Sequence, residues 1–156
     1  MRVSITAVGR LRAGPEQVLI DDYLKRFDKA ARPRGLGPAT VREVEDRKGG
    51  GMAAEGALLD AAIPDGAFRV MLDERGRQMS SPDFAKRMMH VAEQGRRDMV
   101  FVIGGADGLD PALRDTADLK LSFGPMVWPH MLVRVMVAEQ LYRAASILGG
   151  SPYHRT

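Results

Sequence analysis

The stretch M-V-F-V-I-G-G-A-D-G-L, residues 99–109, joins five consecutive apolar residues to a loop with three glycines. An uninterrupted apolar run of this length is typical of a strand buried on both faces of a parallel sheet. Glycines at the end of such a strand let the backbone turn sharply and come close to a ligand or to another part of the chain. The stretch therefore predicts a central strand over 99–103 that ends in a tight loop.

Strand and helix patterns alternate along the remaining sequence. Alternating or continuous apolar patterns predict further strands at 2–8, 40–44, 68–73 and 119–123. Apolar residues at helical spacing predict helices at 15–27, 52–63, 81–96, 110–118 and 131–148. This alternation indicates one α/β domain over residues 1–156 with a largely parallel sheet, and such sheets bind ligands at the carboxyl ends of their strands.

The composition is that of a globular protein from a reducing compartment. Of the 156 residues, 45% are hydrophobic and none is cysteine, which excludes disulfides, thiolate nucleophiles and cysteine-based zinc sites. The first residues do not form a signal peptide, and no apolar segment approaches transmembrane length. We therefore expect a soluble, cytoplasmic protein without a membrane partner.

Positive charge is concentrated in the N-terminal third. The formal net charge is +3, and residues 1–50 contain 11 Lys and Arg against 7 Asp and Glu. Such a surface attracts polyanions, although a solvated basic face is an equally good interpretation. The basic residues are Arg2, Arg10, Arg12, Lys25, Arg26, Lys29, Arg32, Arg34, Arg42, Arg47 and Lys48.

Neither glycine cluster matches a dinucleotide-binding fingerprint in its required context. The order at 104–108 is G-G-x-x-G rather than G-x-G-x-x-G, and by itself it is also consistent with a plain turn before the next helix. Residues 49–54 fit the looser G-x-G-x-x-A form, but a charged run at 43–48 precedes them instead of a buried strand. A nicotinamide-dependent oxidoreductase is therefore disfavoured.

The segment L-S-F-G-P-M-V-W-P-H, residues 121–130, places two prolines, a glycine and the only Trp after a predicted strand. Such an apolar loop is expected to fold over the core, a partner subunit or a ligand. The next helix is apolar on nearly all sides, so it lies in the core or in a subunit interface. Within it, Arg134 needs a partner if buried, and Glu139 and Arg143 have the spacing of a surface ion pair.

The chain ends with S-P-Y-H-R-T, residues 151–156, directly after two glycines that end the last helix. Tyr153, His154 and Arg155 carry side chains that hydrogen-bond, transfer protons or bind anions. Six extended residues reach about 20 Å, which is far enough to enter a pocket of a neighbouring subunit. The alternative is an exposed chain end without a function.

Two motifs together are similar to one known family. The run P-H-M-L-V-R-V-M-V-A-E-Q-L-Y-R-A-A-S-I-L-G-G-S-P-Y-H-R at 129–155, with F-V-I-G-G-A-D-G-L at 101–109 upstream, closely resembles the bacterial 23S rRNA pseudouridine N3-methyltransferase family. These enzymes belong to the SPOUT class, whose C-terminal trefoil knot binds S-adenosylmethionine. The resemblance extends over essentially the whole chain and is weakest at residues 30–66. It implies a SPOUT-type α/β fold and methylation of N3 of a pseudouridine in 23S ribosomal RNA.

The resemblance also implies where the methyl donor binds. An apolar slot surrounded by backbone groups suits an adenine, and the reaction requires no metal. One expected position lies at the end of the strand predicted at 68–73, one directly follows the strand predicted at 99–103, and the others form the stretch 123–128. Carried over position by position, the S-adenosylmethionine site consists of Leu72, Gly104, Phe123, Gly124, Pro125, Met126, Val127 and Trp128.

The implied reaction needs groups that stabilise the N3 imide anion or accept its proton. Arg143 and Arg155 are suited to hold phosphate or imide oxygens, Tyr153 to stack on the base, and His154 or His130 to accept a proton. The identity of the base is left open, and positioning alone could suffice. The expected partners are 23S rRNA in assembled ribosomal particles and a second copy of the chain, whose tail enters the donor pocket. The alternative is a non-catalytic RNA-binding protein on the same fold.

Overall fold

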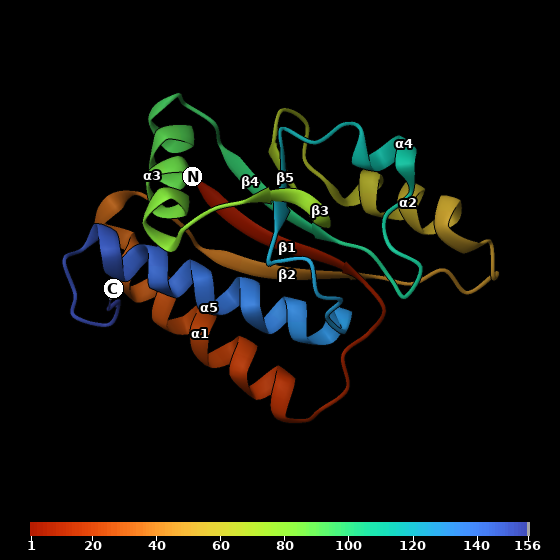
Figure 1. Ribbon diagram of the computed structural model, residues 1–156, viewed down its shortest axis with the longest axis horizontal. Helices are drawn as coiled ribbons and strands as arrows, with labels where there is room; N and C mark the ends of the chain where they lie inside the picture. The colour runs from red at the N-terminus through yellow and green to blue at the C-terminus, as the bar shows by residue number, and fades with distance from the viewer. Residues whose placement is uncertain (156) are drawn as a thin grey trace.

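Five parallel strands form one sheet in the order β2-β1-β4-β3-β5 in the computed structural model, which describes residues 1–155 (Figure 1). The predicted α/β fold, with a parallel sheet and a long C-terminal helix, is confirmed. The strands are β1 (Arg2–Val8), β2 (Ala39–Val44), β3 (Phe68–Gln78), β4 (Asp98–Ile103) and β5 (Leu119–Ser122). The helices are α1 (Pro15–Ala31), α2 (Gly51–Ala62), α3 (Ser81–Glu93), α4 (Pro111–Arg114) and α5 (His130–Leu148), and a short 3-10 helix, η1 (Arg32–Arg34), follows α1.

Helices cover both faces of the sheet (Figure 1). α1, α3 and α5 pack on one face, where Phe27, Phe84 and Leu141 share a core with Phe101 of β4. α2 and α4 cover the opposite face, where the core includes Val102 of β4. All six residues of β4 are buried, which explains why its apolar run shows no alternation. No helix within residues 1–155 has both the length and the apolar content needed to cross a bilayer.

Two predicted elements have different bounds. β3 continues to Gln78, beyond the predicted end at 73, because its pairing with β5 shifts register between Leu72 and Arg77 and then resumes. The extension carries mostly polar and charged side chains, so it leaves no apolar pattern in the sequence. α4 is only four residues long, because the Thr116 hydroxyl donates to the Leu113 carbonyl at 2.7 Å in a turn. The remaining elements differ from the prediction by no more than four residues at either end.

Arg134 of α5 is 1% exposed and has the largest fully buried side chain among the described residues. Its guanidinium donates to the carbonyls of Val8 and Gly9 at 2.6 and 2.8 Å and to the Glu43 carboxylate at 2.9 Å. The same carboxylate accepts the Leu11 N–H. The predicted need for a partner is therefore confirmed, and Arg134 fastens the beginning of α5 to the carboxyl ends of β1 and β2.

Candidate active site

A cavity of about 330 Å³ lies at the carboxyl edge of the sheet, where β3, β4 and β5 give way to loops. Its walls come from the irregular middle of β3 around Leu72 and Asp73, from the loop after β4 and from the loop after β5. His130 and Val133 of α5 also line it. This is the edge at which the sequence predicted that a ligand binds.

The loop after β4 doubles back so tightly that only glycine fits at its start. A Cβ atom on Gly104 would lie 2.6 Å from the carbonyl carbon and oxygen of Gly108. Gly108 has φ +85°, a conformation that L side chains rarely adopt, and its N–H donates to the Gly105 carbonyl at 3.0 Å. The predicted tight loop is confirmed, and its backbone forms one wall of the cavity.

Ser122, the last residue of β5, connects two walls of the cavity. Its hydroxyl donates to the Glu74 carbonyl at 2.9 Å and accepts the Gly124 N–H at 3.0 Å. The residue is 5% exposed. Sequence reasoning missed Ser122, because a lone serine carries no motif and only the return of β3 beside β5 supplies its partner.

Sequence reasoning predicted only part of the polar side of the cavity: His130 was among the expected proton acceptors, but the charged residues there were missed. The Asp73 carboxylate lies 4.0 Å from the guanidinium groups of Arg75 and Arg114, which belong to different elements. Nδ1 of His130 is buried and has no hydrogen-bond partner among the described residues, so it is available to a ligand atom. Within residues 1–155, no group of three or more His, Asp or Glu side chains is arranged to hold a metal ion. For the charged residues, the one signal in the sequence was the position of Asp73 at the end of a predicted strand.

The structure brings together the residues expected to bind the methyl donor. Pro125 belongs to the same loop as most of them but does not line the cavity. Met126 and Val127 are 70% and 81% exposed, so this wall is open to solvent in the single chain. The other seven expected residues all line the cavity: Leu72, Gly104, Phe123, Gly124, Met126, Val127 and Trp128.

Most residues expected to act on the substrate base form a second group, around Arg143 in the C-terminal half of α5. Arg143 donates to Oε1 of Glu139 from Nε and Nη2, at 3.0 and 2.7 Å. The Tyr153 hydroxyl donates to the same oxygen at 3.0 Å, and Nδ1 of His154 lies 3.2 Å from Nη1 of Arg143. The Arg143 guanidinium lies 4.8 Å from the centre of the Tyr153 ring. The tail thus folds back on α5. The ion pair of Glu139 with Arg143, predicted to lie on the surface, is partly buried beneath it.

The environment of the second group raises the pKa of two of its members, Tyr153 and Arg143. Burial, together with the hydrogen bond to Glu139, raises the pKa of the Tyr153 phenol, so Tyr153 is a neutral O–H donor near pH 7. The hydrogen bond to Glu139 raises the pKa of the Arg143 guanidinium. Nε2 of His154 is buried without a partner among the described residues, whereas Arg155 is exposed. The group therefore combines a permanent cation, a neutral hydroxyl and an imidazole.

The two groups of expected site residues lie at opposite ends of α5. His130 opens the helix beside the cavity, and Arg143 lies roughly 20 Å further along at 1.5 Å per residue. Figure 1 shows the C-terminus at the left end of α5, away from the loops at the right. Within one chain, the structure does not bring Tyr153, His154 and Arg155 to the cavity.

The fold is similar to that of two solved structures. The tRNA (m1G37) methyltransferase from Aquifex aeolicus superposes with a TM-score of 0.54 at 12% sequence identity, over 99% of this chain and 74% of that chain. A probable methylase family protein from Haemophilus influenzae gives a TM-score of 0.50 at 14% identity, over 99% of this chain and 70% of that one. The protein thus has the parallel α/β fold of this class of methyltransferases.

The sequence comparison is more specific. Residues 1–154 match a family model described as "Predicted SPOUT methyltransferase", and the chain belongs to the SPOUT methyltransferase family. Proteins named Ribosomal RNA large subunit methyltransferase H are 68% identical in Ruegeria pomeroyi, 69% in Roseobacter denitrificans and 65% in Paracoccus denitrificans, each over 99% of this chain and 99% of the relative. The recognition made from the sequence is confirmed, and the chain is a methyltransferase. The trefoil knot implied by the resemblance stays a prediction.

Proposed function

We propose that this protein transfers a methyl group from S-adenosylmethionine to N3 of a pseudouridine in the 23S RNA of the large ribosomal subunit. One observation carries the proposal: seven of the residues expected at the donor site converge on one glycine-walled cavity at the carboxyl edge of the sheet. The names of relatives that are 64% to 69% identical support large-subunit RNA as the substrate. This substrate places the protein in the cytoplasm.

The cavity offers the chemistry that the methyl donor requires. Leu72, Met126 and Trp128 would form an apolar slot for its adenine, and the backbone around Gly104 would bind the polar edge of the base. The unpartnered Nδ1 of His130 is a polar group available to the rest of the molecule. When bound, S-adenosylmethionine supplies a methyl group activated by a sulfonium.

The residues expected to act on the base suit a pseudouridine as the methyl acceptor. N3 carries an imide proton that is only weakly acidic, so the site must stabilise the anion or accept the proton during transfer. Arg143 and Arg155 would hold imide or phosphate oxygens, and Tyr153 would donate a hydrogen bond or stack on the base. His154 and His130 are the two candidates for the proton acceptor. The contacts around Arg143 would orient Arg143, Tyr153 and His154 before RNA binds.

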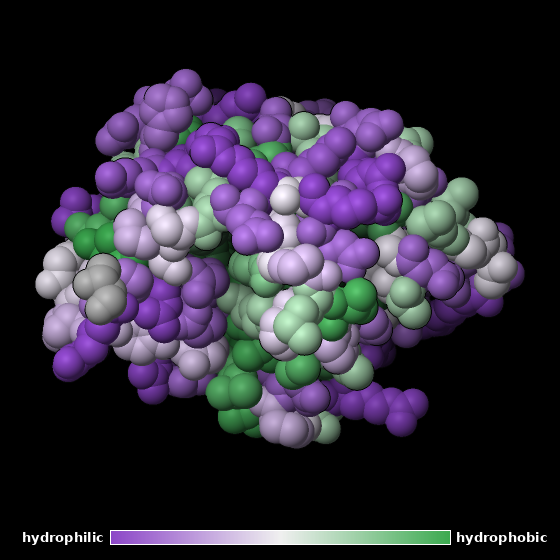
Figure 2. Space-filling view, in the orientation of Figure 1, coloured by the Kyte–Doolittle hydropathy of each residue, from purple (hydrophilic) through white to green (hydrophobic). Residues whose placement is uncertain are grey.

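A homodimer would unite the two groups, because the tail of one chain would enter the cavity of its partner. The separation of the groups along α5 supports this arrangement. An exposed apolar patch also supports it; the patch includes the green band that Figure 2 shows low in the centre of the molecule. Isolated proteins rarely expose large apolar patches. The patch joins the start of α1 to the loop after β5 and the first turn of α5, and its residues are Val18, Leu19, Met126, Val127, Trp128, Met131 and Leu132.

Methyl mapping tests the reaction. Mass analysis of large-subunit RNA from cells that lack the protein should show one pseudouridine without its methyl group, and the purified protein should restore it. Assembled particles should be methylated faster than naked 23S RNA. Calorimetry with S-adenosylmethionine should detect binding. A folded protein that binds RNA but gives no heat with the donor would favour the non-catalytic alternative.

Mixed dimers test the arrangement of the tail. A chain with Gly104→Ala has a cavity that binds the donor weakly and an intact tail, whereas a chain lacking residues 153–156 has an intact cavity and no tail; methylation is measured at a donor concentration that saturates only the intact cavity. Each should be inactive alone, and the mixed dimer should regain methylation at one of its two sites. If the mixed dimer stays inactive while both chains fold and associate, the tail does not act on the partner.

A further inference from the structure

Three neighbouring strands begin near arginines at the edge of the sheet opposite the cavity. Arg34 precedes β2, Arg2 opens β1 and Arg97 precedes β4. Backbone contacts join these beginnings: the Met1 nitrogen donates to the Gly35 carbonyl at 2.6 Å, and the Arg2 N–H donates to the Arg97 carbonyl at 2.8 Å. We call Arg34, Arg2 and Arg97 the amino-edge row; Arg34 belongs to η1, which the Met1–Gly35 contact joins to the start of β1.

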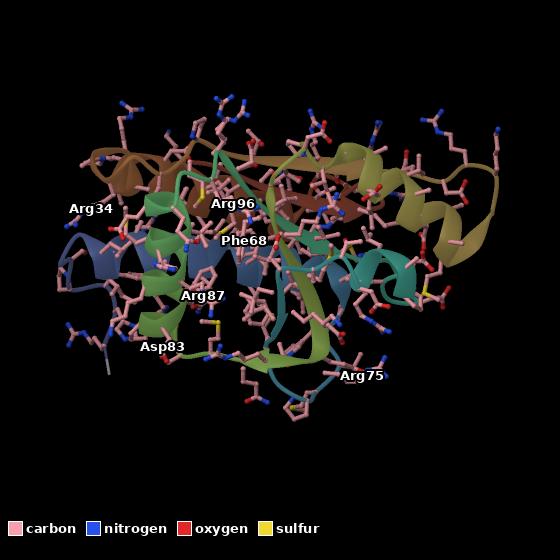
Figure 3. All side chains as sticks on the ribbon, turned by 90° about the horizontal axis from the view of Figure 1, so that it is seen from above. Arg34, Phe68, Arg75, Asp83, Arg87 and Arg96 are labelled. Atoms are coloured by element: carbon pink, nitrogen blue, oxygen red, sulfur yellow. The ribbon has the colours of Figure 1, made fainter. Side chains whose placement is uncertain are left out.

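The amino-edge row is an exposed, positively charged surface. All three side chains are exposed, and Figure 3 shows Arg34 pointing outward at the left end of the molecule. Within residues 1–155, no carboxylate forms an ion pair with Arg34 or Arg97. Arg2 pairs with Asp98, but its side chain stays 66% exposed. Arg34 and Arg97 therefore offer guanidinium donors that no carboxylate of this part of the chain neutralises, whereas Arg2 shares its charge with Asp98.

The other half of the same edge carries more carboxylates. Asp65 precedes β3, and Asp115 and Asp118 precede β5. Basic groups accompany them, because Asp115 pairs with Lys120 at 3.7 Å and Asp118 accepts the Arg69 N–H at 2.8 Å. The balance of charge is therefore more positive along β2, β1 and β4, and a polyanion is attracted more strongly to that half.

The amino-edge row lies too far from the cavity of its own chain to serve it. Arg2 and Val8 stand at the two ends of β1, roughly 20 Å apart at 3.3 Å per residue, and the cavity lies toward the Val8 end. The tail lies at the same end as the row, because α5 runs back from the carboxyl edge (Figure 1). A partner's cavity that receives the tail is therefore also near the row.

We propose that the amino-edge row binds the backbone of the ribosomal RNA and holds it for the cavity of the partner subunit. The inference rests on the proposed function, because it needs an RNA substrate and a tail that acts on the partner. Paired guanidinium donors match two oxygens of a phosphate, and this favours a nucleic-acid backbone as the ligand. One protomer then holds the RNA while the other holds the methyl donor. Arg97 lies outside the basic N-terminal third, so the charge distribution in the sequence did not reveal it.

Charge reversal tests whether the row binds RNA. In the variant Arg34→Glu/Arg97→Glu, the affinity for 23S RNA should fall at least about tenfold at 0.15 M salt. The plot of log affinity against log salt concentration should become less steep by about 1.4, because two phosphate contacts are lost at about 0.7 each. The matched variant Lys86→Glu/Lys120→Glu removes the same charge elsewhere and should bind RNA with nearly unchanged affinity. The affinity for S-adenosylmethionine should be unchanged in both. Equal RNA affinity for the two variants would overturn the proposal.

Purified mixed dimers test which cavity the row serves. In the first mixture, a Gly104→Ala chain is paired with the Arg34→Glu/Arg97→Glu chain, so the intact cavity faces an intact row and tail. In the second, one chain carries all three substitutions and is paired with an unchanged chain, so the intact cavity faces the reversed row. We expect about half of the unchanged activity in the first mixture and little in the second, measured as methyl transfer to 23S RNA.

Each other outcome identifies what fails. The opposite pattern would show that the row serves its own cavity, and activity in both mixtures would show that the row is not needed. Inactivity in both overturns the inference if the mixture of Gly104→Ala with the tail-deleted chain is active. If that reference mixture is inactive, the tail does not act on the partner's cavity. The inference about the amino-edge row is then wrong as well, because it requires that arrangement. If the unchanged protein does not methylate 23S RNA at all, the proposed function itself is wrong.

Discussion

Replacing Gly104 with alanine tests whether the tight loop after β4 forms the methyl-donor site. The added methyl group would lie 2.6 Å from the carbonyl carbon and oxygen of Gly108 and 2.9 Å from the Leu109 nitrogen. These are backbone atoms that cannot rotate away, so the loop must move by roughly 0.8 Å before the closest contact reaches 3.4 Å. A misplacement of about 1 Å can reduce the function of a site by about 10²-fold. We therefore expect the affinity for S-adenosylmethionine to fall by about 10²-fold.

Isothermal titration calorimetry measures this loss, and a thermal unfolding curve shows whether the variant is folded. Gly105→Ala is the matched control in the same loop. Its added methyl group would meet the end of the Glu55 side chain at 3.0 Å, which can rotate away, so this variant should keep most of its affinity. If folded Gly104→Ala binds the donor as tightly as the unchanged protein, the assignment of the loop to the donor site is wrong. Equal losses in both variants would point to a general disturbance of the loop.

Three further predictions concern stability and assembly. Arg134→Met should lower the free energy of unfolding by about 3 kcal/mol, because it leaves the Glu43 carboxylate and two carbonyls without their donor. Urea unfolding measures this loss. Glu43→Gln keeps an acceptor for Arg134 and should lower the free energy of unfolding by less. The raised pKa of the Tyr153 phenol means that its contribution to stability is complete below about pH 10, the pKa of an unfolded tyrosine, and declines as the pH rises further. Melting temperatures between pH 9 and about 11.5 should therefore fall less in Tyr153→Phe than in the unchanged protein, and parallel curves would contradict this. Leu19→Glu, in the exposed apolar patch, should shift sedimentation from dimer to monomer, whereas Leu58→Glu, at a similarly exposed leucine on α2, should not.

Local sequence patterns predicted the elements whose burial is uniform along the chain. β4 was recognisable because its side chains enter both cores, so every position from 99 to 103 is apolar. The end of β3 was not recognisable, because residues 74–76 form the irregularity in its pairing, Arg77 and Gln78 are held by backbone pairing with β5, and the side chains remain mostly exposed. The helix expected at 110–118 was wrong beyond Arg114, where side-chain bonding in a turn replaces the helical pattern.

The candidate site likewise contains residues that local patterns predicted and residues that they did not. Gly104 and the loop at 123–128 were predicted, because glycines and an apolar loop after strands are local signals. Ser122 and Asp73 were missed, because their roles depend on partners that the fold brings from other elements. The pairing of Glu139 with Arg143 was expected from helical spacing, but nothing local showed that Tyr153 and His154 would join it.

By itself, then, the sequence determined the alternation of strands and helices, the tight loop after β4 and the class of enzyme, because each depends on residues close together along the chain or on a motif. Only the tertiary structure decided the strand order, the residues that form the cavity at one edge and the arginines brought together at the other. It also decided that Arg134 bonds to Val8, across 126 positions of the chain. The physical reason is that side-chain patterns report whether a position is buried, whereas the partner that covers it is set by how the whole chain packs.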